Sequence, residues 1–250
     1  MIDSALSESV FGAFLILVRV GAIVAMLPGF NANYVTPRIR LVLALAITLM
    51  LMPILSPSLP RQPSTPVSLM ILVAGEGVVG LFIGGIARVV FSALHAAGTM
   101  AAYFASLANA IVQDPVADNQ SSTLAGFFAI LGMVLIFITD LHHLMLRGIV
   151  DGYQIFPVGQ LPALEGVAET ITRLVSESFS MGLQLAAPFL IVGVGYQVGL
   201  GLLGRLMPQL PVFFVGLPIQ VGLQVWVIML AISGVMLVFL DYFAQQVSLS

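Results

Sequence analysis

The stretch Gly204–Pro218 reads G-R-L-M-P-Q-L-P-V-F-F-V-G-L-P. It joins two long apolar segments and contains Arg205, the only charged residue between Glu177 and Asp241. Each of its three prolines lacks an N–H and fixes φ, so we do not expect a continuous helix. At membrane depth, a broken backbone is tolerated only where protein buries it or where it lines a cavity. We therefore predict a buried turn around Arg205, with a carboxylate or carbonyl beside its guanidinium, in a chain that belongs to a larger assembly. The residues assigned to this turn are Arg205, Pro208, Gln209, Pro211, Phe213, Gly216 and Pro218.

The composition is that of an integral membrane protein. Hydrophobic residues make up 60% of the 250 residues and charged residues 8%, whereas a soluble domain has about 25% charged residues. All eight basic residues are Arg, and the net charge of −3 is spread thinly, which argues against a nucleic-acid partner. Cys is absent, so disulfides, thiolate metal sites and Cys nucleophiles are excluded. The first ten residues carry no basic residue, unlike a secretory signal, so we expect the first apolar run to be retained.

Apolar runs predict an all-α protein with about six long helices arranged as hairpins, since about 20 residues span a bilayer. The expected helices cover residues 11–27, 39–55, 67–112 (as two helices that divide near 88–98), 123–146, 179–203 and 212–243. Apolar residues at helical spacing add an amphipathic helix over residues 163–178. Pro188 predicts a kink within the helix over residues 179–203.

We expect one domain over residues 1–250, without an internal repeat. Its N-terminal hairpins occupy residues 1–112 and its C-terminal hairpins residues 123–250. The intervening residues 113–122 form the most polar interior stretch and predict a central loop.

Ionisable residues inside apolar runs are the first candidates for function in a membrane protein. The candidates for burial are Arg19, Glu76, Arg88, Asp140 and His142. We expect them to pair within a protein-lined interior or to reach an interface, and a proton or coupling-ion role for Glu76 or Asp140 is the alternative.

No metal site is expected from this set. Asp140 and His142 are two residues apart and do not share a helix face. His142 and His143 are adjacent and, on a helix, cannot both face one metal ion. G-x-S-x-G, H-E-x-x-H and P-loop patterns are absent, so we also expect no catalysis and no cofactor.

Small residues accompany Glu76. Gly80 and Gly84 form a G-x-x-x-G pair, which lets helix backbones approach closely. We assign the glycine-rich faces of Gly75–Gly85 and Gly193–Gly204 to packing against neighbouring subunits.

Several stretches of the chain resemble the FliR family of the flagellar type III protein export gate. The most specific likeness is the stretch Gly204–Pro218, and the resemblance covers nearly the whole chain in one register. The other matching stretches are Arg19–Phe30, Val35–Leu41, Glu76 with its following glycines, Asp114-Pro115, His142-His143 and Asp151, and Pro157 with Gly159.

The resemblance implies a pore subunit that acts by assembly and gating, without catalysis, cofactor or metal. In the family, one copy joins several copies of FliP and FliQ in a cone of helical hairpins, which FlhB wraps and FlhA surrounds. Unfolded flagellar subunits enter this pore at the bacterial inner membrane, within the basal body. The family also implies a FliP-like hairpin unit fused to a FliQ-like one.

The resemblance further implies a pore plug over residues 103–115. The plug candidates are Phe104, Leu107, Ile111, Val112, Asp114 and Pro115. Apolar members of this set can seal a pore by excluding water, and plain helix packing is the alternative. The chain departs from the family here: residues 104–106 read Phe-Ala-Ser where Gln-Met-Gly is common, and Leu141 replaces a glycine before the His pair.

Three other functions are compared with the flagellar gate subunit. The injectisome homologue resembles the family throughout but usually carries a Lys-containing stretch after its Pro-Gln motif, and this chain has no Lys. An ion-coupled secondary transporter often has matching interruptions in two halves, whereas Pro188 and Gly204–Pro218 both lie in the C-terminal part. The third alternative is a membrane enzyme, and the sequence contains no catalytic motif that supports it.

Overall fold

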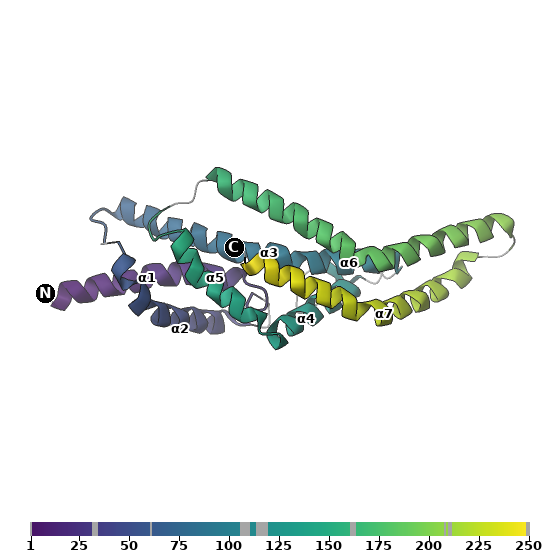
Figure 1. Ribbon diagram of the computed structural model, residues 1–250, viewed down its shortest axis with the longest axis horizontal. Helices are drawn as coiled ribbons and strands as arrows, with labels where there is room; N and C mark the ends of the chain where they lie inside the picture. Colours follow the sequence, from purple (N-terminus) through teal and green to yellow (C-terminus); the bar gives the residue numbers. More distant parts are fainter. Residues whose placement is uncertain are drawn as a thin grey trace. The chain divides into compact units, whose positions relative to one another are not determined.

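The protein is an all-α chain (Figure 1), and the predicted fold class is confirmed. The described residues also include one short pair of strands. The computed structural model describes residues 2–31, 35–60, 62–105, 111–113, 120–160, 164–207, 209 and 212–248. Its elements in chain order are α1 (Ile2–Met26), α2 (Pro37–Leu55), the 3-10 helix η1 (Ser56–Ser58), α3 (Pro66–Phe104), β1 (Ile111–Gln113), β2 (Gln120–Ser122), α4 (Thr123–Ile138), α5 (Leu141–Ile155), α6 (Leu164–Leu206) and α7 (Val212–Ser248).

Helix α3 is one helix of 39 residues, where the sequence predicted two. That prediction assumed spans of about 20 residues. No proline interrupts the run after Pro66, and many of its residues are alanine, leucine or methionine, which favour the helix. The backbone therefore has no local cause to break between residues 88 and 98.

The predicted helix over residues 123–146 is instead two helices, α4 and α5, whose axes are bent by 77°. Asp140 lies between them with a φ of 59°. Non-glycine residues rarely adopt this left-handed conformation, and a right-handed helix cannot continue through it. The bend thus comes from one backbone dihedral.

Helix α6 combines the two helices predicted over residues 163–178 and 179–203 and contains Pro188. It continues to Leu206, and α7 begins at Val212 with Pro218 inside it. The stretch Gly204–Pro218 is therefore helical at both ends, and Met207 and Gln209 between the two helices are not helical. The expectation that this stretch is not a continuous helix is confirmed. Pro218 lies inside α7, beyond its first turn, so it cannot donate the backbone hydrogen bond that a helix normally makes to the carbonyl four residues earlier.

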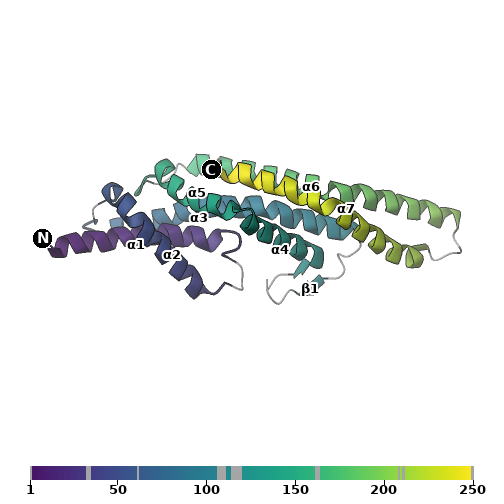
Figure 2. The ribbon, with the colours of Figure 1, turned by 60° about the horizontal axis from the view of Figure 1, so that its bottom comes forward.

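Strands β1 and β2 pair antiparallel, with Ile111 opposite Ser122 and Gln113 opposite Gln120. Figure 2 shows β1 near the start of α4. The predicted loop over residues 113–122 thus has paired backbone at its two ends, and residues 114–119 lie outside the described residues.

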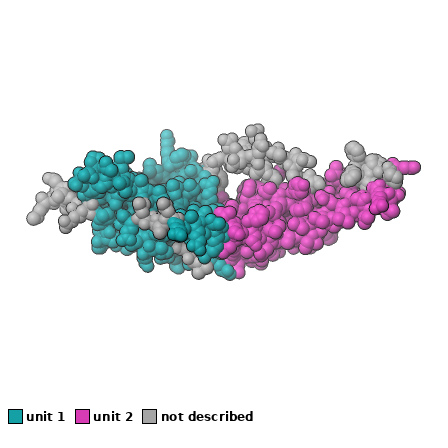
Figure 3. All heavy atoms as spheres, turned by 90° about the horizontal axis from the view of Figure 1, so that it is seen from above, with its two compact units in different colours: residues 1–90, 140–174, 244–250 teal, residues 91–139, 175–243 magenta. Residues whose placement is uncertain are grey.

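The chain forms two compact units (Figure 3). Unit 1 comprises residues 1–90, 140–174 and 244–250, and unit 2 comprises residues 91–139 and 175–243. Helices α3, α6 and α7 each contribute to both units. The core of unit 2 is aromatic: the ring of Phe128 packs on that of Phe189, and the ring of Phe91 packs edge-on against that of Phe239.

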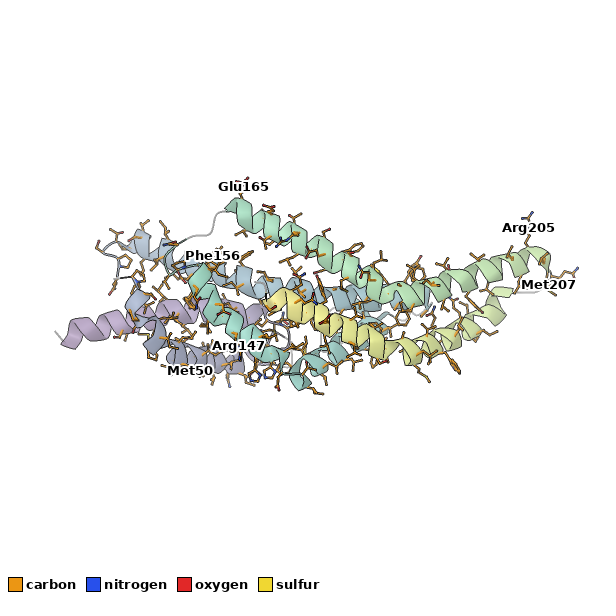
Figure 4. All side chains as sticks on the ribbon, in the orientation of Figure 1. Met50, Arg147, Phe156, Glu165, Arg205 and Met207 are labelled. Atoms are coloured by element: carbon orange, nitrogen blue, oxygen red, sulfur yellow. The ribbon has the colours of Figure 1, made fainter. Side chains whose placement is uncertain are left out.

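Among the described residues, five helices are long and apolar enough to cross a membrane, and the bent pair α4–α5 is a sixth candidate. Their surfaces remain apolar. Met50 on α2 (Figure 4) is 74% exposed, and Leu230 on α7 is also 74% exposed. Apolar surface on this scale requires lipid or protein around it.

Candidate functional site

A buried ion pair lies at the centre of unit 1. Arg19 lies in the C-terminal half of α1 with 0% of its side chain exposed, and Glu76 on α3 is 2% exposed. Arg19 Nε lies 3.4 Å from Glu76 Oε2. A charge buried without a partner is costly, so each of these two residues makes the other tolerable in the interior.

The pair also holds the end of α5 and the turn after it. Arg19 Nη2 donates a hydrogen bond of 2.8 Å to the carbonyl oxygen of Phe156, and the backbone N–H of Gly159 donates one of 2.9 Å to Glu76 Oε1. The guanidinium carbon lies 4.3 Å from the ring centroid of Tyr153, a cation–π arrangement. Residues far apart in sequence are thereby fastened to α1 and α3.

Gly159 is required at its position in two ways. Its φ of +85° lies in the region that glycine adopts freely. A Cβ there would also lie 3.2 Å from Leu72 Cδ1. The backbone N–H that reaches Glu76 is thus presented by a turn that only glycine forms without strain.

A cavity of about 150 Å³ lies beside the carboxylate. Its lining residues are Ser68, Ile71, Leu72, Gly75, Glu76, Gly159 and Gln160. Among the described residues, Glu76 Oε2 and Arg19 Nε and Nη1 are buried without a hydrogen-bond partner of good geometry. Buried polar atoms of this kind are usually satisfied by ordered water. The arrangement can therefore hold water next to a buried carboxylate.

Close packing of α1 on α3 positions the pair. A Cβ at Gly80 would fall 2.5 Å from the carbonyl oxygen of Arg19, and one at Gly84 would fall 2.8 Å from that of Ile23. The predicted close approach at this G-x-x-x-G pair therefore occurs within the chain, against α1. Its assignment to a neighbouring subunit is wrong for these two glycines.

In unit 2, buried amides hold the end of α3. Gln220 Nε2 on α7 donates a hydrogen bond of 2.8 Å to the carbonyl oxygen of Phe104, the last residue of α3. Gln224 Nε2 donates one of 3.2 Å to the carbonyl oxygen of Phe189 on α6. A Cβ at Gly193 would lie 2.8 Å from Phe104 Cβ. Phe104, near the start of the predicted plug over residues 103–115, is thus held by α6 and α7 together.

The residues of the predicted turn are not brought together as expected. Arg205 is exposed in the last turn of α6 and projects from the ribbon in Figure 4, so its expected burial is wrong. There a cation interacts favourably with the carbonyl end of the helix. Gln209 is exposed too. Gly216 is buried, and its carbonyl oxygen accepts a 2.7 Å hydrogen bond from the Tyr196 hydroxyl. Pro218 lies within α7; Pro208, Pro211 and the side chain of Phe213 lie outside the described residues.

Three predicted buried ionisable residues occupy more open positions. Arg88 and Asp140 are exposed, and His142 is half-buried, so the expected burial is wrong for the first two. Arg88 lies on the outer side of α3, where Nη1 approaches Met26 Sδ at 3.5 Å. Asp140 is exposed at the bend between α4 and α5, with a carboxylate oxygen 3.6 Å from His143 Nδ1.

Few of the plug candidates fall on described positions. Phe104 is half-buried at the end of α3, with its ring edge-on to that of Tyr103. Ile111 and Val112 form β1, and their side chains lie outside the described residues, as do Leu107, Asp114 and Pro115 altogether.

Sequence reasoning missed Tyr153, Gln220 and Gln224. The two glutamines carried a usable signal, because they are polar, four residues apart and set in an apolar run, which places them on one helix face. Tyr153 carried none, since its role depends on how α5 lies against α1.

The family described as "Bacterial export proteins, family 1" matches residues 10–246. The chain belongs to this family. The resemblance read from the sequence motifs is thus confirmed. With its apolar helices, membership makes the chain a membrane protein of a bacterial export family.

Individual relatives carry two kinds of name. "Flagellar biosynthetic protein FliR" of Caulobacter vibrioides is 35% identical over 236 residues, which cover 94% of each chain. The protein of the same name from Escherichia coli is 28% identical over 81% of this chain and 77% of its own. "Yop proteins translocation protein T" of Yersinia pestis is 31% identical over 66% of this chain and 65% of its own.

Proposed function

We propose that the chain is a pore-forming subunit of the flagellar type III protein export gate, needed for export of flagellar subunits and for flagellum assembly. One observation carries this proposal: the flagellar relative from Caulobacter vibrioides is 35% identical and aligns over 94% of both chains. An alignment of this extent leaves little of either chain for a different function.

The proposal includes the assembly around the chain. The partners are homologues of FliP and FliQ in one core complex and of FlhB and FlhA around it, in the inner membrane within the basal body. The apolar outer faces of α2, α6 and α7 support an obligate assembly, because exposed large apolar residues such as Leu49, Val198 and Trp226 need partner helices or lipid.

In this proposal the chain acts by packing and gating, not by catalysis. Residues 103–115 close the pore, and apolar side chains there exclude water until a substrate enters. The contacts at Phe104 support this role indirectly: Gln220 and Gly193 fix Phe104, which lies near the start of that segment.

Deletion and complementation in the native bacterium test the function. Deleting the gene is expected to abolish swimming and the release of flagellar filament protein into the medium, and the intact gene is expected to restore both. Export that continues without the gene would refute the proposal.

Purification tests the partners separately. The tagged chain, extracted in mild detergent and measured by native mass spectrometry, is expected in a large complex with homologues of FliP and FliQ. A monomer or small homo-oligomer would contradict the assembly and would favour a transporter.

The virulence injectisome is the second candidate, because the Yersinia pestis relative is 31% identical. That alignment covers 66% of the chain, against 94% for the flagellar relative. The deletion strain distinguishes them: loss of swimming with intact effector secretion supports the flagellar gate, and the reverse supports the injectisome.

A further inference from the structure

We propose that Asp140, His142 and His143 form a binding site for a divalent metal ion of the zinc class, at the start of α5. Each side chain offers one ligand atom, and the three atoms all lie within 4.8 Å of one another. The proposed site concerns a part of unit 1 that the export function leaves unexplained.

The spacing of the ligand atoms fits one ion. Asp140 Oδ1 and His143 Nδ1 are 3.6 Å apart. Two ligands about 2.1 Å from a tetrahedral zinc ion are separated by about 3.4 Å. The rings of His142 and His143 lie side by side, with centroids 4.1 Å apart. A shift of about one ångström therefore brings all three ligand atoms to coordination distance.

The backbone at Asp140 makes this grouping possible. On a straight helix, residues 140 and 142 would face different sides. Because Asp140 has a φ of 59°, its side chain instead lies back over the first turn of α5, where the N–H of His143 donates a 3.0 Å hydrogen bond to the Asp140 carbonyl. Two arguments from the sequence spoke against a metal site. The first placed Asp140 and His142 on one continuous helix, and the left-handed Asp140 removes it. The second held that adjacent histidines on a helix cannot face one ion, and it is overturned because the ligand atoms lie within 4.8 Å of one another although both histidines are in α5.

The ligand set selects the ion class. Two imidazoles and one carboxylate suit Zn²⁺ and the neighbouring transition metals, whereas Mg²⁺ and Ca²⁺ prefer oxygen ligands alone. Three protein ligands leave a fourth position for water or for a group from another chain. All three residues are exposed or half-buried, so an ion can reach them. A bound ion would tie the carboxylate at the bend to the first turn of α5.

The test uses the full chain, purified in detergent through a tag without histidine and stripped of metal with a chelator. Titration calorimetry with Zn²⁺ is expected to give one equivalent bound per chain with a micromolar Kd. Titration with Co²⁺ is expected to give the visible absorption of a four-coordinate ion, and Zn²⁺ is expected to abolish it.

Two variants remove single ligands. His143→Ala and Asp140→Asn are each expected to weaken Zn²⁺ binding at least about tenfold. Asn tolerates positive φ, so Asp140→Asn keeps the bend and removes only the carboxylate. The matched control is His95→Ala, which removes the third histidine of the chain from an exposed position on α3 and is expected to leave the Kd unchanged.

Three results would overturn the site. The first is no saturable binding below about 1 mM. The second is a Kd that both ligand variants leave unchanged, and the third is a loss with His95→Ala equal to theirs. Circular dichroism of each variant checks that the helices remain.

Discussion

Arg19 carries a full charge into the interior of unit 1, and its value to the fold depends on Glu76. Replacing it by Met keeps most of the side-chain volume but leaves the carboxylate buried without its cation. We expect Arg19→Met to lower the free energy of unfolding in detergent by about 3–5 kcal/mol. Denaturant unfolding followed by circular dichroism measures the change.

Two controls separate the pair from its parts. Arg147→Met makes the same exchange at an exposed site on α5 and is expected to change stability by less than about 0.5 kcal/mol. The double variant Arg19→Met with Glu76→Gln leaves no unpaired charge, so it is expected to cost less than the sum of its single changes. Strict additivity would mean that the two residues do not interact.

Gly80 and Gly85 on α3 form a natural comparison. A Cβ at Gly80 would fall 2.5 Å from the Arg19 carbonyl oxygen and 2.8 Å from Ala22 Cβ, whereas one at Gly85 would meet nothing within 4 Å. We expect Gly80→Ala to destabilise by about 1–3 kcal/mol, because α1 and α3 must separate. Gly85→Ala is expected to be neutral or stabilising by up to about 1 kcal/mol, since Ala favours the helix. Thermal unfolding of the two variants side by side decides; equal losses would contradict the packing.

The role of a single residue could be predicted from the sequence where that role depends on its sequence neighbours alone. Arg19 and Glu76 were identifiable as candidates because charges are rare in apolar runs, and Gly80 because of its spacing. Their partners were not, since the contacts to Phe156 and Gly159 join segments 137 and 83 residues apart. The burial predicted for Arg205 was wrong because that prediction rested on its apolar sequence neighbours, and these do not show that the residue lies exposed at a helix end.

The end of α3 depends on a second element for its last hydrogen bond. A helix leaves its final carbonyls without intrahelical partners, and Gln220 on α7 satisfies that of Phe104. Gln220→Leu keeps the volume and removes the donor. We expect a loss of about 1–3 kcal/mol and faster amide hydrogen exchange over residues 100–105.

Gln197→Leu is the matched control for this helix end, because Gln197 is exposed on α6. It is expected to leave exchange over residues 100–105 unchanged. If Gln220→Leu also leaves it unchanged, the amide does not hold the end of α3. In cells, Gln220→Leu is expected to raise ion leakage, because Phe104 lies near the start of the proposed plug.

Elements were predicted well where composition sets their limits and poorly where it does not. The starts of α2 and α7 follow turn-rich or proline-rich sequence, which the chain makes visible. The length of α3 was missed because apolar periodicity does not say whether a run of nearly 40 residues is one helix or two. The bend at Asp140 was missed because it rests on one left-handed residue, with no proline or glycine to mark it.

Over the whole molecule, the exposed surface of the long helices is apolar and needs lipid or partner subunits around it. Large apolar side chains are exposed along α2, α6 and α7, among them Met50, Trp226 and Leu237. Lipid covers such surface only within the membrane, and the proposed subunits of the gate would cover the rest. A variant at a contact of the assembly should therefore leave the folding of the isolated chain unchanged while it impairs function.

Arg205 offers that test, because it is exposed at the end of α6 and is the only charge between Glu177 and Asp241. We expect Arg205→Ala to change the stability of the purified chain by less than about 0.5 kcal/mol. In the proposed gate its guanidinium meets a partner's carboxylate or carbonyl, so the variant is expected to reduce swimming and recovery of the complex. Arg147→Ala, also exposed, is the matched control for losing one surface cation. Full swimming with Arg205→Ala would place that helix end outside the interfaces of the gate, and a large loss of stability in the isolated chain would mean that Arg205 supports the fold itself.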